Sequence, residues 1–178
     1  ETDGSGALSW TTPSSGGASA IDDLSDAKSA GTNFTGSLIV GHQTTGSLSS
    51  ATYNTAVGLA TLDAITTGDY NTAIGFSALS ANTAGNSNTA GGYNALYANT
   101  SGDYNTATGH MALYLNTSGD YNSAFGMMAL KANTTGTRNL AIGKGAYDAA
   151  DTENDNLAIG YDALGGAIDG GEYNIAIG

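Results

Sequence analysis

The stretch Asn71-Thr72-Ala73-Ile74-Gly75 recurs along the chain and decides its fold. Its first residue comes back at a fixed distance, at Asn54, Asn71, Asn88, Asn105, Asn122, Asn139, Asn156 and Asn174. The residue numbers of successive asparagines rise by 17 six times running, and by 18 at the last step. The closing glycine returns at Gly58, Gly75, Gly92, Gly109, Gly126, Gly143 and Gly160, with further copies at Gly41 and Gly178. A fixed period of this length indicates a stack of repeats rather than one globular core.

Two further blocks follow the stretch within each period. In one repeat they are Phe76-Ser77-Ala78-Leu79 and Asn82-Thr83-Ala84-Gly85. We interpret one repeat as a short strand, a glycine corner, a second short strand and an Asn-Thr-x-Gly turn. Because so short a repeat leaves no room for a crossover helix between parallel strands, the strands must pair from coil to coil. The sequence therefore predicts an all-β fold, a parallel β-roll or β-solenoid of 17-residue coils over residues 37–178. It holds nine repeat copies, the first degenerate and the last incomplete.

The two faces of the repeated strand differ in character. Asparagine, alanine and glycine alternate on one face, which suits a narrow interior with stacked asparagines that pass amide hydrogen bonds from coil to coil. The other face carries large apolar residues, and near the C-terminus the threonine position also becomes leucine or isoleucine. These residues are Ile74, Phe125, Leu140, Ile142, Leu157, Ile159, Ile175 and Ile177. A strand that is apolar on both faces is normally buried on both, so we expect neighbouring copies to cover this face in an obligate homotrimer.

Composition excludes several classes of function. Four Lys+Arg against 16 Asp+Glu give a formal net charge of −12, too acidic for binding nucleic acid or an anionic membrane. No apolar run is long enough to insert into a membrane. There is no cysteine, and the two histidines, His42 and His110, fall on coils too far apart to share a site. We therefore expect neither an enzyme nor a cofactor.

A metal site and an ice-binding surface are weighed against simpler interpretations. The acidic residues from Asp151 to Asp155 resemble a calcium loop only faintly, and we prefer a solvated acidic turn without metal. Threonines recur in two columns, of which Thr72 and Thr83 are members, and such arrays of hydroxyls and methyls suggest ice binding. The simpler interpretation is that β-branched residues stack well in parallel ladders.

Tyrosines form partial columns at two positions of the repeat. One column holds Tyr53, Tyr70, Tyr104 and Tyr121, and the other holds Tyr97 and Tyr114. We expect them to cover the turns with their phenol tips in water. A groove between such columns also suits a sugar ring, so a cell-surface glycan is an open additional partner.

The repeats resemble two families of surface fibres. The Asn-x-Ala-Ile-Gly strand is similar to the head repeats of trimeric autotransporter adhesins, which form trimeric β-rolls with a typically shorter period. The longer pattern from Gly68 to Thr83, Gly-Asp-Tyr-Asn-Thr-Ala-Ile-Gly-Phe followed by Ala-Leu and Asn-Thr, is more similar to repeats of phage tail-fibre proteins. Residues 1–36 are predicted to be a connector, and their stretch Thr2 to Thr11 also resembles a segment of such fibres. Both resemblances imply a trimeric, elongated shaft or head without enzymatic activity.

Three expectations follow from the resemblance. The preferred function is a structural segment of a trimeric virion fibre, outside the cell, that presents an attachment module and contacts other fibre or baseplate proteins. The alternative is the head of an adhesin on a bacterial surface, which would bind host or matrix. Because the final repeat ends on its corner glycine, Gly178, with an uncapped strand edge, we also expect further repeats or another module beyond it.

Overall fold

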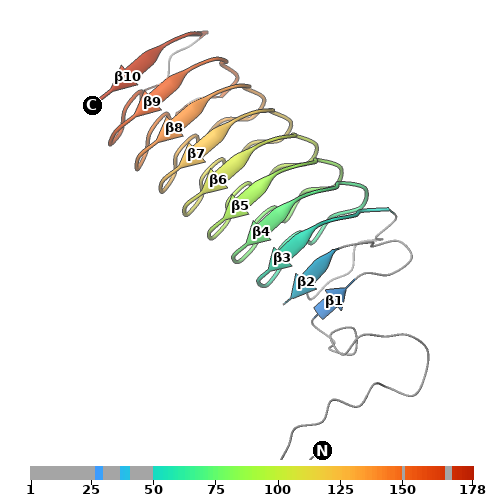
Figure 1. The fold of residues 1–178 in the computed structure, drawn as a ribbon. Coiled ribbons are helices and arrows are strands. Elements are labelled where there is room, and N and C mark those ends of the chain that lie inside the picture. The colour runs from blue at the N-terminus through green and yellow to red at the C-terminus, as the bar shows by residue number, and fades with distance from the viewer. Residues whose placement is uncertain (1–26, 30–36, 41–49, 150, 167–169) are drawn as a thin grey trace, which may run out of the picture.

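The computed structural model describes residues 27–29, 37–40, 50–149, 151–166 and 170–178, which contain ten strands and no helix (Figure 1). Each strand is three residues long. They are β1 (Ala27–Ser29), β2 (Leu38–Val40), β3 (Thr55–Val57), β4 (Thr72–Ile74), β5 (Thr89–Gly91), β6 (Thr106–Thr108), β7 (Ser123–Phe125), β8 (Leu140–Ile142), β9 (Leu157–Ile159) and β10 (Ile175–Ile177). From β3 to β10 each repeat contributes one strand, which begins one residue after the repeated asparagine.

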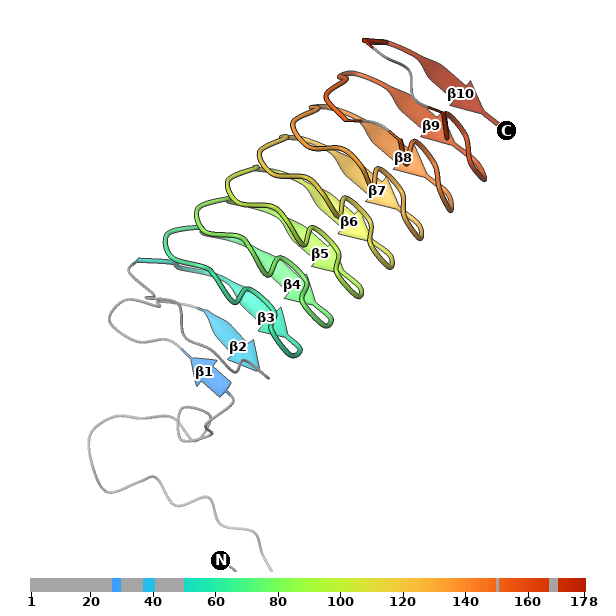
Figure 2. The ribbon, with the colours of Figure 1, turned by 180° about the vertical axis from the view of Figure 1, so that it is seen from behind.

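The strands form a single sheet in sequence order, from β1 to β10. From β2 to β10 every neighbouring pair is parallel and in register, so that Thr55 lies opposite Thr72 and Ala56 opposite Ala73. Figures 1 and 2 show the coils stacked into a rod, with the strands along one side and the turns along the other. The predicted parallel β-solenoid with 17-residue coils is therefore confirmed.

Strand β1 runs antiparallel to β2, with Lys28 opposite Ile39. It lies within the region that the sequence assigned to a connector, and it covers the backbone edge of the first coil. Most of the predicted connector, including Thr2 to Thr11, lies outside the described residues, as does His42.

The second strand predicted for each repeat is wrong. Residues 76–79 form a turn, in which Ser77 and Leu79 adopt left-handed φ values of 52° and 51°. The turn is still bonded to its neighbours, since the backbone N–H of Leu79 donates to the carbonyl oxygen of Ala95 at 3.0 Å. Alternation of left-handed residues bends the backbone at every second position, which an extended strand does not allow.

The interior is built from small residues and stacked amides. The strand alanines, such as Ala56 and Ala73, and the turn residues Ala78 and Leu79 are fully buried. The isoleucine of the same strand, Ile74, points outward and is exposed. The predicted division into an interior alanine face and an outer apolar face is what the structure has.

Candidate functional site

Asparagines at the first position of each repeat form a continuous buried column. The backbone N–H of Asn71 donates to Oδ1 of Asn54 at 2.9 Å, and the same bond links every later step as far as Asn174. The side-chain Nδ2 of Asn71 donates across the coil to the carbonyl oxygen of Gly85 at 2.8 Å. The contact present at each of these steps is from backbone N–H to amide oxygen, and the expected amide-to-amide bond accompanies it at three of them, donated by Asn105, Asn139 and Asn174. At the N-terminal end the hydroxyl of Ser37 accepts the bond from the Asn54 N–H.

A second asparagine column was missed by the sequence analysis. Asn82, Asn99, Asn116 and Asn133 are fully buried, and here the side chains do bond to each other, as from Asn99 Nδ2 to Asn82 Oδ1 at 2.9 Å. The signal was the recurring Asn-Thr-x-Gly block, which we had attributed to turn chemistry alone. Within the described residues Oδ1 of Asn133 lacks a partner, and the sequence has Ala150 at the next position of this column.

Two features of the corner positions exclude a side chain: the backbone angle φ and the closeness of the next coil. Gly75 has φ +133°, which L-residues rarely adopt, and a Cβ there would lie 2.6 Å from the carbonyl oxygen of Gly92. The same pair of restrictions holds at Gly58, Gly92, Gly109, Gly126, Gly143 and Gly160. The glycine column therefore lets the coils approach each other closely at the corner.

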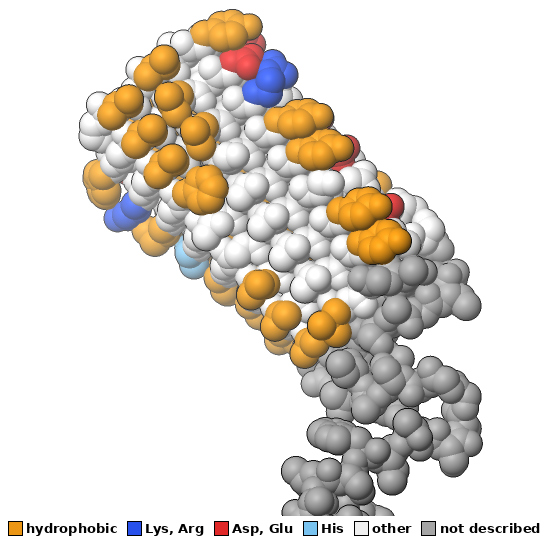
Figure 3. All heavy atoms as spheres, viewed as in Figure 1, with side chains coloured by type: hydrophobic (Ala, Val, Ile, Leu, Met, Phe, Trp, Pro, Cys, Tyr) orange, Lys and Arg blue, Asp and Glu red, His pale blue; other side chains and the backbone are white. Residues whose placement is uncertain are grey.

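Apolar side chains gather on the outer side of the sheet near the C-terminus, as Figure 3 shows. We call this surface the outer apolar face. It consists of Phe125, Leu140, Ile142, Leu157, Ile159, Ile175 and Ile177. Exposure is greatest at the last strand, where Ile175 and Ile177 are each 72% exposed. Ile74 lies on the same side of the sheet, nearer the N-terminus, between Val57 and Gly91 of the neighbouring strands.

The aromatic columns are stacked ring on ring. Tyr53 and Tyr70 have ring centroids 5.0 Å apart and planes within 7°, and Tyr104 and Tyr121 form an equivalent pair. Tyr97 and Tyr114 stack in the second column, and Phe76, Tyr93 and His110 stack in a third. Because ring faces within a stack lie against each other, only an interruption or an end of a column offers a free face.

The threonine column of the turns, which includes Thr83, is bonded into the coil stack. In the turns, the hydroxyl of Thr83 donates to the carbonyl oxygen of Thr100 at 3.0 Å, and Thr100 repeats the bond to Thr117. Because these hydroxyls donate to the next coil, the turn column fits the structural interpretation better than ice binding.

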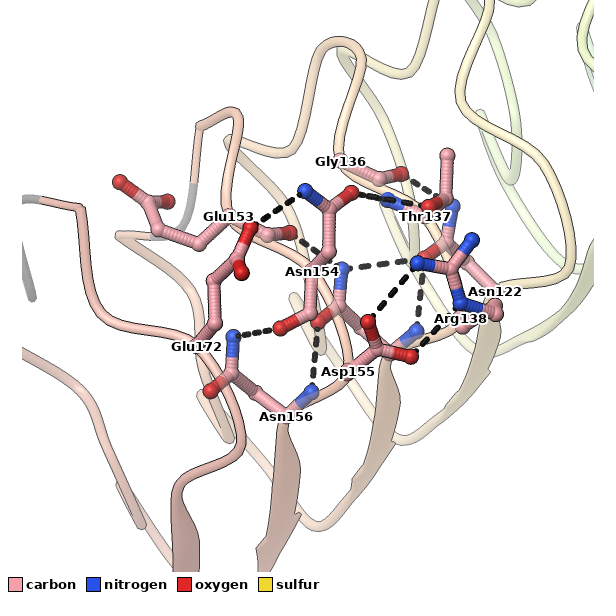
Figure 4. A network of polar contacts seen from close by, with 10 residues as sticks. Asn122, Gly136, Thr137, Arg138, Glu153, Asn154, Asp155, Asn156 and Glu172 are labelled. Carbon is pink, nitrogen blue, oxygen red and sulfur yellow. Dashed lines mark hydrogen bonds and ion pairs between the residues drawn. The ribbon is translucent and has the colours of Figure 1, made fainter.

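The acidic residues of the last coils are engaged by other groups. Burial alone would raise the pKa of Glu153, but the backbone N–H groups that donate to its carboxylate lower that pKa overall. Arg138 forms an ion pair with Asp155 at 2.6 Å, which lowers the pKa of Asp155 (Figure 4). Burial raises the pKa of the Tyr147 phenol, which accepts a hydrogen bond from Asn156. The described residues hold no group of three or more His, Asp or Glu side chains arranged for a metal ion.

The part of the chain that the structure describes has no helix with the length and apolar character needed to cross a membrane. No protein-family model, curated protein or solved structure matches this chain.

Proposed function

We propose that this chain is a structural segment of a homotrimeric virion fibre, which holds an attachment module away from the particle. The observation that carries the proposal is the outer apolar face. Its large side chains lie in two adjacent columns on β7 to β10 and are partly or largely exposed to solvent in the single chain. Isolated soluble proteins rarely leave so continuous an apolar surface in water.

The direction of this face favours copies that lie side by side. The columns follow the order of the strands, so they extend along the rod (Figure 1). Three rods packed around a common axis would bury the same columns in every copy, as closed cyclic symmetry requires. Contact along the rod keeps the assembly elongated, and an elongated trimer suits a shaft.

The fibre role also fits the chemistry of the rest of the molecule. The residues that recur at the repeat period, the buried asparagines and the corner glycines, hold successive coils together. Their role is therefore structural. The net charge of −12 keeps the remaining surface hydrated.

Native mass spectrometry with analytical ultracentrifugation tests the trimer at micromolar concentration. Ile142→Asp should reduce the trimer mass to that of the monomer, because it places an unpaired charge in the interface at a cost of several kcal/mol, on the order of 3–5. Ser118→Asp adds the same charge at an exposed turn and should leave the mass unchanged. A monomeric mass for the unaltered chain would refute the proposal.

A further inference from the structure

The outermost tyrosine column is interrupted once between its two stacked pairs. Along the column the residues are Tyr53, Tyr70, Ser87, Tyr104 and Tyr121, so serine replaces the ring at the middle coil. The stacked pairs are Tyr53 with Tyr70 and Tyr104 with Tyr121. Figure 3 shows hydrophobic side chains in two groups, with a gap between them, along one edge of the rod. The interruption leaves one ring face of Tyr70 and one of Tyr104 turned toward the same space.

The width of this gap follows from the spacing of the coils. Within each pair the centroids are 5.0 Å apart, and the two rings beside the gap are separated by two such steps, about 10 Å. A third ring placed midway would lie about 5 Å from both, within the range for stacked rings. The gap therefore has room for one six-membered ring.

The two tyrosines beside the gap and the serine between them share one backbone conformation. Tyr70, Ser87 and Tyr104 have φ values of 60°, 56° and 57°, so the serine departs from the column in its side chain and not in its conformation. Tyr70 is 60% exposed and Tyr104 is 53% exposed, which leaves their rings open to a ligand from solvent.

Polar residues adjoin the residues of the gap in the chain. Asn86 and Asp103 precede Ser87 and Tyr104 in the chain, are partly exposed, and are joined by a bond from Nδ2 to Oδ1 at 3.1 Å. The Ser87 side chain is also partly exposed. A ligand that fits must offer apolar ring faces to the tyrosines and hydroxyl groups to these side chains. A pyranose has both, since its C–H bonds form the faces and its hydroxyls the rim.

We propose that the gap at Ser87 binds one hexopyranose ring of a glycan, held between the rings of Tyr70 and Tyr104. The chain's charge of −12 disfavours acidic sugars and nucleotides, so the ligand is a neutral sugar. At the binding strength per atom that is typical of small ligands, a hexose of twelve heavy atoms should bind with a dissociation constant on the order of millimolar. Several copies in an assembly would raise the avidity for a glycan-covered surface.

Saturation-transfer NMR tests this with methyl glycosides of glucose, galactose, mannose, N-acetylglucosamine and N-acetylgalactosamine. At least one should show transfer to its ring C–H protons. Ser87→Tyr should abolish the transfer, because the new ring would fill the gap and complete the column. The backbone can hold a tyrosine at this position, since Tyr70 and Tyr104 have nearly the same φ as Ser87. Ser80→Tyr is the matched control, since it adds the same ring at the end of the Tyr97 column and should keep the signal. Tyr70→Ala and Tyr104→Ala should each weaken binding about two- to tenfold.

Three results would overturn the assignment. The first is the absence of transfer to any of the five glycosides when each is present at a concentration about tenfold above the expected millimolar dissociation constant. The second is transfer that persists in Ser87→Tyr. The third is binding of N-acetylphenylalanine amide in the gap without binding of a glycoside, which would assign the gap to an aromatic peptide side chain. The proposed trimer is tested by mass and the proposed sugar site by NMR. Failure of one proposal can therefore be told apart from failure of the other.

Discussion

Replacing Gly109 with alanine tests how closely the coils approach at the glycine corner. The new Cβ would lie 2.5 Å from the carbonyl oxygen of Gly126 and 2.6 Å from its carbonyl carbon. Neither atom belongs to a flexible side chain, so the backbone of the next coil must move. Its position is fixed by a hydrogen bond of 2.8 Å from the Gly126 N–H to the carbonyl oxygen of Thr108.

Two costs add in this variant. Holding alanine at φ +139° costs about 1–3 kcal/mol in backbone strain. Displacing the neighbouring coil weakens at least one backbone hydrogen bond, worth about 0.5–1.5 kcal/mol. The free energy of unfolding should therefore fall by about 1.5–4.5 kcal/mol. For a chain of this length each kcal/mol lowers the melting temperature by about 2–4 °C, so Tm should fall by at least about 3 °C.

Thermal unfolding followed by circular dichroism measures this, with Gly91→Ala as the matched control. Gly91 lies in strand β5 on the outer side of the sheet, and a Cβ there would meet nothing nearer than 3.9 Å. Its replacement should leave Tm unchanged or raise it, because glycine weakens a strand by about 0.5–1 kcal/mol relative to alanine. Equal melting temperatures for the two variants would show that the corner relaxes freely, and the argument from close approach would be lost.

Two further variants test other parts of the coil stack. Asn105→Leu should lower the free energy of unfolding by about 1–3 kcal/mol in urea denaturation, because it leaves the buried N–H of Asn122 without its acceptor. The carbonyl oxygen of Gly119 loses one of its two bonds and keeps the one from Asn116. A loss under about 0.5 kcal/mol would contradict the ladder's role. Glu153 has a pKa below its usual 4.5 in the folded chain, so its stabilising effect is present above that pH and is lost as pH falls through the folded pKa. Glu153→Gln should therefore reduce the loss of Tm between neutral and acidic pH, and an unchanged pH profile would show that this carboxylate does not link folding to protonation.

The sequence predicted those features that depend on the repeat period and on side-chain alternation. The constant period sets the register of Thr55 against Thr72, since identical neighbours pair best at identical positions. Alternation placed Ala73 inside and Ile74 outside, as found. Both inferences follow from local geometry and needed no knowledge of distant contacts.

Features set by contacts between coils were not predictable in this way. Leu79 suggests an extended strand by its residue type, yet it adopts φ 51° and bonds to the next coil through its N–H. Left-handed leucine is locally unfavourable and is held by the stack, which a propensity argument does not include. The buried column from Asn82 was overlooked for a related reason, because its partners lie on neighbouring coils while its turn chemistry is local.

The matching surfaces of successive coils have a consequence for how such a chain can change its length in evolution. Each coil offers the next an asparagine oxygen, a corner carbonyl and a parallel strand edge at equivalent places. Deleting one whole period, such as 88–104, would bring Asn105 onto Asn71 with the same bonds available. Deleting any other small number would put a side chain where a glycine is needed. Recombination between the repeats can therefore shorten or extend the rod in whole steps of about 4.8 Å, while the cross-section of the rod stays the same.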